Sequence, residues 1–218
     1  MNAWSLENVF FIIASLAGGL LFYYIATSAR KSGKKKEREE IVSILINFIL
    51  FVWAGKLLMN LPIFLSDPLA VLAYPSASPA FFTAVILMVV NVAYRVKRHA
   101  MDIHGFLTAF LPVFLGAAFS YEFLDIIWHG NHLSLWQQGL LLILMVAFML
   151  LREKLAPVTM ACMIFAGWSA GQLLLSFFLP FTSLFGYMMT VWFLLPVFIT
   201  SIIVLIFNRR KVASCLQT

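Results

Sequence analysis

The sequence predicts an all-α integral membrane protein with seven transmembrane helices, and three observations support this. The 218 residues are 63% hydrophobic and only 11% charged, whereas soluble domains carry about 25% charged residues. Several apolar runs reach the roughly 18 residues that mark a spanning helix. The basic residues gather between those runs. We therefore expect a single helical domain over residues 1–218, embedded in lipid.

Charged tracts, proline and glycine mark the ends of the expected spans in turn. The first apolar run has no basic residue before it and a polybasic tract after it, the reverse of a cleaved signal peptide, so we expect it to be retained. KKKEREE precedes the second run, PSASP precedes the third, and RVKR separates the third from the fourth. The fourth run ends at WHG, the fifth at REK, the sixth begins with LAP, and NRRK ends the seventh. The expected spans are about 6–28, 41–63, 79–95, 103–127, 135–151, 155–179 and 184–207.

The basic residues also predict an orientation. All but one of the 15 Lys and Arg residues fall on one side when the connections alternate, in segments 30–38, 95–98, 152–154 and 209–211. The positive-inside rule then places the N-terminus outside and the C-terminus in the cytoplasm. Contact with anionic lipid accounts for the net charge of +6, so we predict no nucleic-acid partner.

The remaining cation, Lys56, and two carboxylates, Glu122 and Asp125, lie within the expected spans. Ionisable groups in lipid are costly and usually face a partner or a cavity. Lys56 and Glu122 reach comparable depth when residues are counted along spans two and four at about 1.5 Å each. We therefore predict an ion pair between them, and expect Gln172 in span six to form an interhelical hydrogen bond.

The stretch GAAFSYEFLDIIWHG, residues 116–130, places Glu122, Asp125 and His129 on one helix face through spacings of three and four residues. Three interpretations stay open: a solvated rim with an ion pair, an acid–base or lipid-headgroup site, and a metal site that also uses His132. The spacing matches no standard metal motif, so we predict no metal and no cofactor. The expected polar cluster comprises Lys56, Glu122, Asp125, His129, His132 and Gln172.

Several stretches carry a resemblance to one protein family. AGKLLMNLPIFLSDPL (54–69) is similar to GGRLGYVLFY and the DPL that follows it in that family, HLSLWQQ (132–138) to HPSQLYE, and FAGWSAGQLLLSFFL (165–179) to YGxxRxxxExxR. RVKRHAMDIHGFLTAFLPVFLGAA looks like the family's basic inner loop and fourth span. In this order the segments resemble the bacterial prolipoprotein diacylglyceryl transferases, over about residues 9–207. Those enzymes move the diacylglyceryl group of phosphatidylglycerol onto a lipoprotein cysteine.

The resemblance implies a seven-span bundle in the bacterial cytoplasmic membrane and a phospholipid partner, such as phosphatidylglycerol. The family signature GRxxNxxNGExxG would fall on residues 118–130. Phe119 then stands at its arginine, Ile127 at its glutamate, and Glu122 and Asp125 at its two asparagines. Gln172 stands at a second arginine, the HGG motif has no counterpart, and the outer head domain is reduced to a few residues.

These departures remove the arginines that would hold an anionic phosphate, and electrostatic stabilisation usually contributes more to catalysis than any other single effect. We therefore transfer the fold and not the reaction. The first function class is a noncatalytic protein that binds lipid or docks a membrane protein partner. The alternative is a repurposed transferase acting on a phospholipid or lipid-anchored substrate at the outer leaflet, with Glu122 or Asp125 as its catalytic base.

Overall fold

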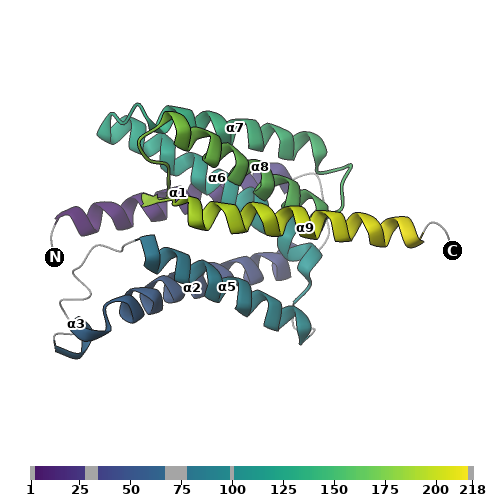
Figure 1. Cartoon of the computed structure of the whole chain (residues 1–218), viewed down its shortest axis with the longest axis horizontal. Coiled ribbons are helices and arrows are strands. Elements are labelled where there is room, and N and C mark those ends of the chain that lie inside the picture. Colours follow the sequence, from purple (N-terminus) through teal and green to yellow (C-terminus); the bar gives the residue numbers. More distant parts are fainter. Residues whose placement is uncertain (1–2, 28–33, 67–77, 99–100, 216–218) are drawn as a thin grey trace. The chain divides into compact units, whose positions relative to one another are not determined.

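The computed structural model describes residues 3–27, 34–66, 78–98 and 101–215, and helices dominate these ranges (Figure 1). Two short strands form a hairpin between the last two helices. The elements, in chain order, are α1 (Ala3–Thr27), α2 (Lys34–Met59), α3 (Leu61–Ser66), α5 (Ser78–Lys97), α6 (Ile103–His129), α7 (Ser134–Leu151), α8 (Pro157–Phe178), β1 (Ser183–Leu184), β2 (Tyr187–Met188) and α9 (Val191–Cys215).

Five helices in the described ranges are long and apolar enough to cross a membrane: α5, α6, α7, α8 and residues 191–208 of α9. Two shorter apolar stretches, Phe10–Ala26 of α1 and Ile46–Met59 of α2, accompany them. An all-helical protein with five such segments is a multi-pass membrane protein. The count of seven spans and the outside position of the N-terminus stay predictions.

The helix ends differ from the expected spans at four places in α2 and α9. α2 begins at Lys34 and not at residue 41, and α9 ends at Cys215 and not at residue 207. The second span was expected to end at residue 63, but α2 stops at Met59 and α3 begins at Leu61. Pro62 lacks an N–H and restricts the residue before it, which favours the start of a new helix. The last span was expected from residue 184, but α9 begins at Val191 because the hairpin occupies residues 183–188.

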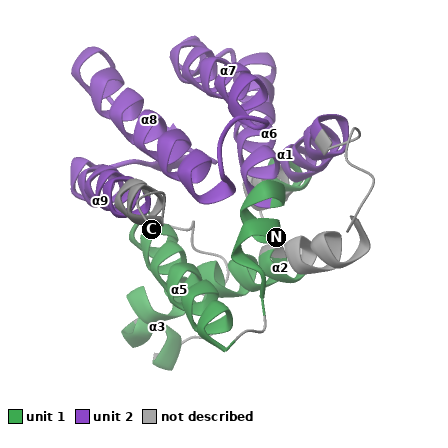
Figure 2. Cartoon of the chain, turned by 90° about the vertical axis from the view of Figure 1, so that its right-hand side faces the viewer, with its two compact units in different colours: residues 1–13, 30–109 green, residues 14–29, 110–218 purple. Residues whose placement is uncertain are grey.

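The chain divides into two compact units (Figure 2). Unit 1 comprises residues 1–13 and 30–109, and unit 2 comprises residues 14–29 and 110–218. The expectation of a single helical domain stays a prediction.

In unit 1, α2 packs against α5 through a small residue and an aromatic pair. A Cβ on Gly55 would lie 2.6 Å from the carbonyl oxygen of Ala80, so the two backbones approach closely there. The rings of Phe48 and Phe81 meet edge to face, with centroids 5.8 Å apart. Small residues allow close helix approach in membranes, where packing replaces the hydrophobic effect.

In unit 2, the second half of α1 lies against α6 through glycines. A Cβ on Gly19 would lie 2.9 Å from Cβ of Ala117, and one on Gly116 would lie 2.7 Å from Cβ of Phe22. Gly18 contributes to the same close packing, since a Cβ on it would meet the Ser120 side chain. Contact at this distance leaves no room for a side chain at these positions.

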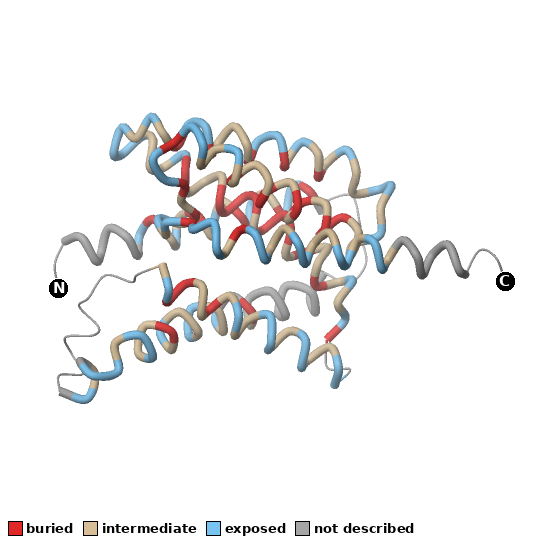
Figure 3. The backbone as a smooth tube through the Cα atoms, in the orientation of Figure 1, coloured by how far each residue is buried: buried red, intermediate tan, exposed pale blue. Residues whose placement is uncertain are grey.

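Aromatic rings join α6 to α8 in the core of unit 2. The ring centroid of Phe114 lies 5.6 Å from that of Phe165 and 6.1 Å from that of Trp168. Buried positions concentrate on α6 and α8 in this unit (Figure 3). α9 joins α8 through a hydrogen bond of 3.0 Å from Asn208 Nδ2 to Thr159 Oγ1.

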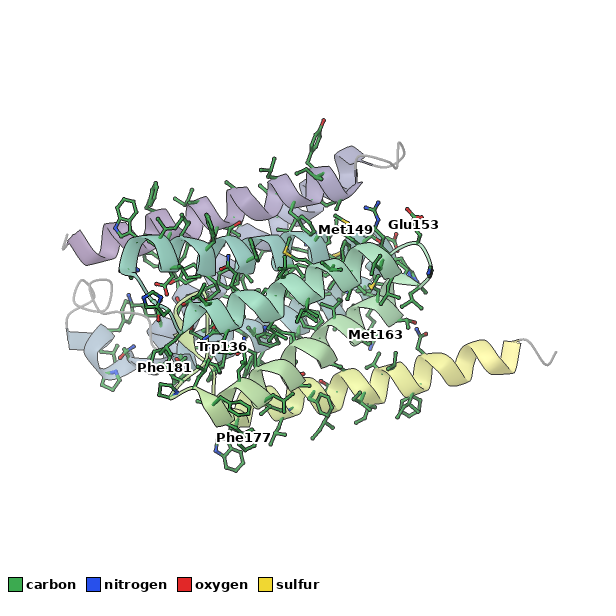
Figure 4. All side chains as sticks on the ribbon, turned by 90° about the horizontal axis from the view of Figure 1, so that it is seen from above. Trp136, Met149, Glu153, Met163, Phe177 and Phe181 are labelled. Carbon is green, nitrogen blue, oxygen red and sulfur yellow. The ribbon has the colours of Figure 1, made fainter. Side chains whose placement is uncertain are left out.

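Two ends of unit 2 can be followed in Figure 4. Trp136, Phe177 and Phe181 lie toward the end where α6 stops and α7 begins, which we call the α6–α7 end, and Met149 and Glu153 lie toward the other (Figure 4). At that other end the Arg152 guanidinium donates a hydrogen bond to the carbonyl oxygen of Ala26, in the last turn of α1. A cation there complements the negative end of the helix dipole.

Candidate functional site at the α6–α7 end of unit 2

The turn between α6 and α7 brings three polar side chains to Asp125. Gly130 has φ of +63°, and its N–H donates to the carbonyl oxygen of Ile126 at 3.0 Å. This is the left-handed residue that commonly ends a helix, and glycine adopts it without steric cost. The chain therefore turns directly after His129 and starts α7 at Ser134.

Asp125 accepts hydrogen bonds from both sides of this turn. Its Oδ2 accepts from Asn131 Nδ2 and from Ser134 Oγ, each at 2.8 Å, and its Oδ1 lies 2.9 Å from His129 Nδ1. Asn131 Oδ1 in turn accepts the N–H of Leu133 at 3.2 Å. We call Asp125, His129, Asn131 and Ser134 the Asp125 clasp. Because its carboxylate is engaged by three partners, Asp125 acts as a structural acceptor that holds the turn.

Glu122 lies one turn before Asp125 and has a different environment. It is 2% exposed, and its Oε2 has no hydrogen-bond partner among the described residues. The Ser134 hydroxyl is also adjacent to this carboxyl. That hydroxyl has a single O–H, and it donates its hydrogen bond to Asp125 in the clasp. Of the two carboxyl groups, Asp125 is engaged in the clasp, and Glu122 is the one that can accept a hydrogen bond from another group.

Three further polar side chains are buried near the level of Glu122, each on a different element. Gln137 on α7, Gln172 on α8 and Thr182 before β1 are 1–2% exposed. Gln137 Oε1 accepts from Oγ and from N–H of Ser183, both at 3.3 Å. Gln172 Oε1 and Thr182 Oγ1 have no hydrogen-bond partner among the described residues. We call Glu122, Gln137, Gln172 and Thr182 the polar layer.

Helix geometry places Glu122, Gln137 and Gln172 within about one turn of a common level. α6 and α7 run antiparallel away from the clasp (Figure 1). Glu122 lies three residues before Asp125 and Gln137 three residues after Ser134, so both stand about 4.5 Å beyond the clasp. A Cβ on Gly171 would meet the Leu140 side chain, so Gln172 lies within about one turn of Gln137.

The hairpin after α8 closes this part of unit 2. Ser183 pairs with Met188 and Leu184 with Tyr187, which leaves a two-residue loop of Phe185 and Gly186. Both loop residues have positive φ, 53° and 79°, as a type I′ turn requires. A phenylalanine rarely adopts this conformation.

The half-buried Phe185 side chain packs against aromatic rings of α6. Its ring centroid lies 5.8 Å from that of Tyr121 and 6.5 Å from that of Phe114. Phe114 stands 15 residues before the end of α6, about 22 Å along the helix. Non-helical backbone at such a depth in a membrane is tolerated only where protein or a polar cavity surrounds it. The buried Thr182 directly precedes this hairpin, and Ser183 of β1 contacts Gln137 of the polar layer.

The structure brings some of the sequence-predicted residues together. Asp125 and His129 are in contact, and Glu122 and Gln172 both belong to the buried interior of unit 2. His132 is exposed in the turn. Lys56 belongs to unit 1, in the last turn of α2, where its carbonyl oxygen accepts a hydrogen bond from Asn60 Nδ2 at 2.9 Å. The Lys56–Glu122 ion pair stays a prediction.

Sequence reasoning missed Gln137, Thr182 and Ser183. Gln137 stands in the apolar stretch SLWQQGLLL, and an amide within a membrane helix needs a hydrogen-bond partner. The pair Phe185–Gly186 marks a turn between two apolar runs. Within the described residues, no group of three or more His, Cys, Asp or Glu side chains is placed to hold a metal ion.

No family model matches this chain, and no similar curated protein or solved structure was found.

Proposed function

We propose that this multi-pass membrane protein binds a membrane phospholipid at the polar layer of unit 2, without a transfer reaction. One observation carries the proposal: Glu122 Oε2, Gln172 Oε1 and Thr182 Oγ1 are buried without hydrogen-bond partners in the described part of the chain. Each such atom costs about 1–3 kcal/mol. A bound polar group would remove that cost, and a membrane offers lipid headgroups at high concentration.

The resemblance to the diacylglyceryl transferases supports the scaffold in this proposal and argues against their reaction. Phe119 and Gln172 stand where that family has arginines, so an anionic phosphate loses its stabilising charges. Asp125, one of the two candidate bases, is engaged in the clasp. The bacterial cytoplasmic membrane, and a membrane protein partner docked there, belong to the same proposal.

Lipid content tests this function directly. The full chain is purified in a mild detergent, delipidated by repeated washing, and its phospholipid is extracted and quantified per mole of protein. We expect about one retained phospholipid. A folded, washed protein with no phospholipid would overturn the proposal.

A repurposed transferase is the second candidate, and Glu122 is the observation that favours it. Its unpartnered Oε2 could accept a proton from an attacking nucleophile, the task of a general base. This alternative predicts altered phospholipid and lipoprotein profiles when the gene is deleted. Unchanged profiles in the deletion strain, compared by mass spectrometry, would remove its support.

A further inference from the structure

We propose that the polar layer binds a primary ammonium group, supplied by the headgroup of an aminophospholipid such as phosphatidylethanolamine. This inference rests on the proposed function and names the class of lipid. It differs from the phosphatidylglycerol that the transferase resemblance implies.

The unpaired atoms of the layer have the chemistry that an ammonium group needs. Glu122 supplies a carboxylate oxygen, Gln172 an amide oxygen and Thr182 a hydroxyl oxygen, and all three accept hydrogen bonds. A primary ammonium carries three N–H donors and no acceptor. A primary ammonium in the layer would therefore meet acceptors that have no partner among the described residues.

Charge points to the same class of ligand. A buried carboxylate is strongly stabilised by a cation that also donates hydrogen bonds, and left unpaired it is costly. The clasp places a second carboxylate, Asp125, one turn away on α6, and its three contacts are with His129, Asn131 and Ser134. A phosphate group would meet two carboxylates here, so the negative part of a headgroup is disfavoured at the layer.

Other common headgroups fit less well. The trimethylammonium of phosphatidylcholine has the charge but no N–H donor. The glycerol of phosphatidylglycerol has hydroxyl donors but no positive charge. The remaining unpaired atom in the described part of unit 2, Trp168 Nε1, is a donor one turn away from Gln172 on α8 and takes no part in ammonium binding.

A competition experiment tests the inference. The full chain is washed free of lipid and incubated with detergent micelles that contain equal amounts of phosphatidylethanolamine, phosphatidylcholine and phosphatidylglycerol. Native mass spectrometry then measures the ratio of bound lipids. We expect phosphatidylethanolamine to exceed each of the others by about tenfold or more, since a hydrogen bond to a charged group contributes at least that factor.

Two charge-neutralising variants give a matched comparison. Glu122→Gln keeps the side-chain size and removes the charge, so we expect the preference for phosphatidylethanolamine to disappear. Glu153→Gln removes the same charge from a side chain that is 81% exposed, and we expect wild-type selectivity. A protonated Glu122 would bind no cation. Selectivity that survives Glu122→Gln therefore overturns the inference, with thermal unfolding in detergent confirming that both variants fold.

Lys56 could supply an ammonium group of its own, and a third variant separates the two sources. We expect Lys56→Met to retain the lipid preference. A preference that appears only in Lys56→Met would show that the chain's own amine takes this role, and would overturn the lipid source. If free ethanolamine stabilises the protein while no lipid is retained, that result would also overturn a lipid as the source of the ammonium group.

The outcomes also separate this inference from the proposed function. A wild-type protein that retains phospholipid without headgroup preference overturns the ammonium site and leaves phospholipid binding standing. A wild-type protein that retains none overturns both.

Discussion

Ser134 Oγ donates a hydrogen bond to Asp125 Oδ2 at 2.8 Å, across the turn that joins α6 to α7. This bond fixes the register of the two helices at the level where Glu122 and Gln137 face the interior of unit 2. It also explains why two neighbouring carboxyl groups take different roles. Asp125 holds the turn, and Glu122 stays without a partner on Oε2 among the described residues.

The Asp125 clasp should contribute to stability through the carboxylate more than through any single donor. Asp125→Ala removes the acceptor for three groups, and we expect it to lower the free energy of unfolding by about 2–4 kcal/mol. Ser134→Ala removes one donor, and we expect a loss of about 1 kcal/mol. Chemical unfolding in mixed micelles measures both. Equal losses in the two variants would contradict the central place of Asp125.

Any side chain at Gly19 should destabilise the contact between α1 and α6. A Cβ there would lie 2.9 Å from Cβ of Ala117, so we expect Gly19→Ala to lower the unfolding temperature. Gly139 on α7 is the matched control, since no heavy atom lies within 4 Å of a Cβ built on it. Alanine exceeds glycine in helix propensity, so Gly139→Ala should stabilise by about 0.5–1 kcal/mol. A tolerated Gly19→Ala would show that the helices are farther apart.

The hairpin loop should be sensitive at Gly186 for two reasons. Its φ of +79° disfavours a side chain, and a Cβ there would also meet the hydroxyl of Tyr121. Gly130 has a similar φ of +63° with open space around it, so Gly130→Ala measures the backbone cost alone, about 1–2 kcal/mol. We expect Gly186→Ala to cost more in thermal unfolding. Equal destabilisation by Gly186→Ala and Gly130→Ala would indicate that position 186 is not in close contact with Tyr121.

The predicted Lys56–Glu122 ion pair can be tested by a double-mutant cycle. An ion pair gives a coupling energy on the order of 1–3 kcal/mol between Lys56→Met and Glu122→Gln. The lipid ammonium site instead predicts additive effects of the two changes. Unfolding of the wild type, both single variants and the double variant in one detergent distinguishes these results.

The sequence predicted the helices of this protein better than its polar interior. The ends of α5, α6, α7 and α8 lie within about two residues of the expected spans, because charged or turn-forming residues bound each apolar run. The hairpin at 183–188 was missed, since LPFTSLFGYM is as apolar as a helix and local hydropathy cannot separate the two. Packing of Phe185 on Tyr121 and Phe114 decides its conformation.

The sequence predicted the charged residues of the candidate site but not its uncharged polar residues. Glu122, Asp125 and His129 stand out as charged residues in an apolar run, so their spacing indicated the shared face. Gln137 and Thr182 carry no charge, and only their burial and the bonds between Gln137 and Ser183 reveal their place in the polar layer. The bonds from Ser134 and Asn131 to Asp125 depend on the turn geometry at Gly130, which spacing alone does not give.

Lipid occupancy of the wild type, Glu122→Gln and Glu153→Gln tests the central claim most directly. Each full chain is purified alike in the same detergent, and native mass spectrometry gives the fraction that carries one phospholipid. We predict equal occupancy for wild type and Glu153→Gln, and occupancy reduced about tenfold for Glu122→Gln, because the buried carboxylate supplies the charged acceptor. Equal occupancy in all three proteins would contradict a lipid-headgroup site at the polar layer.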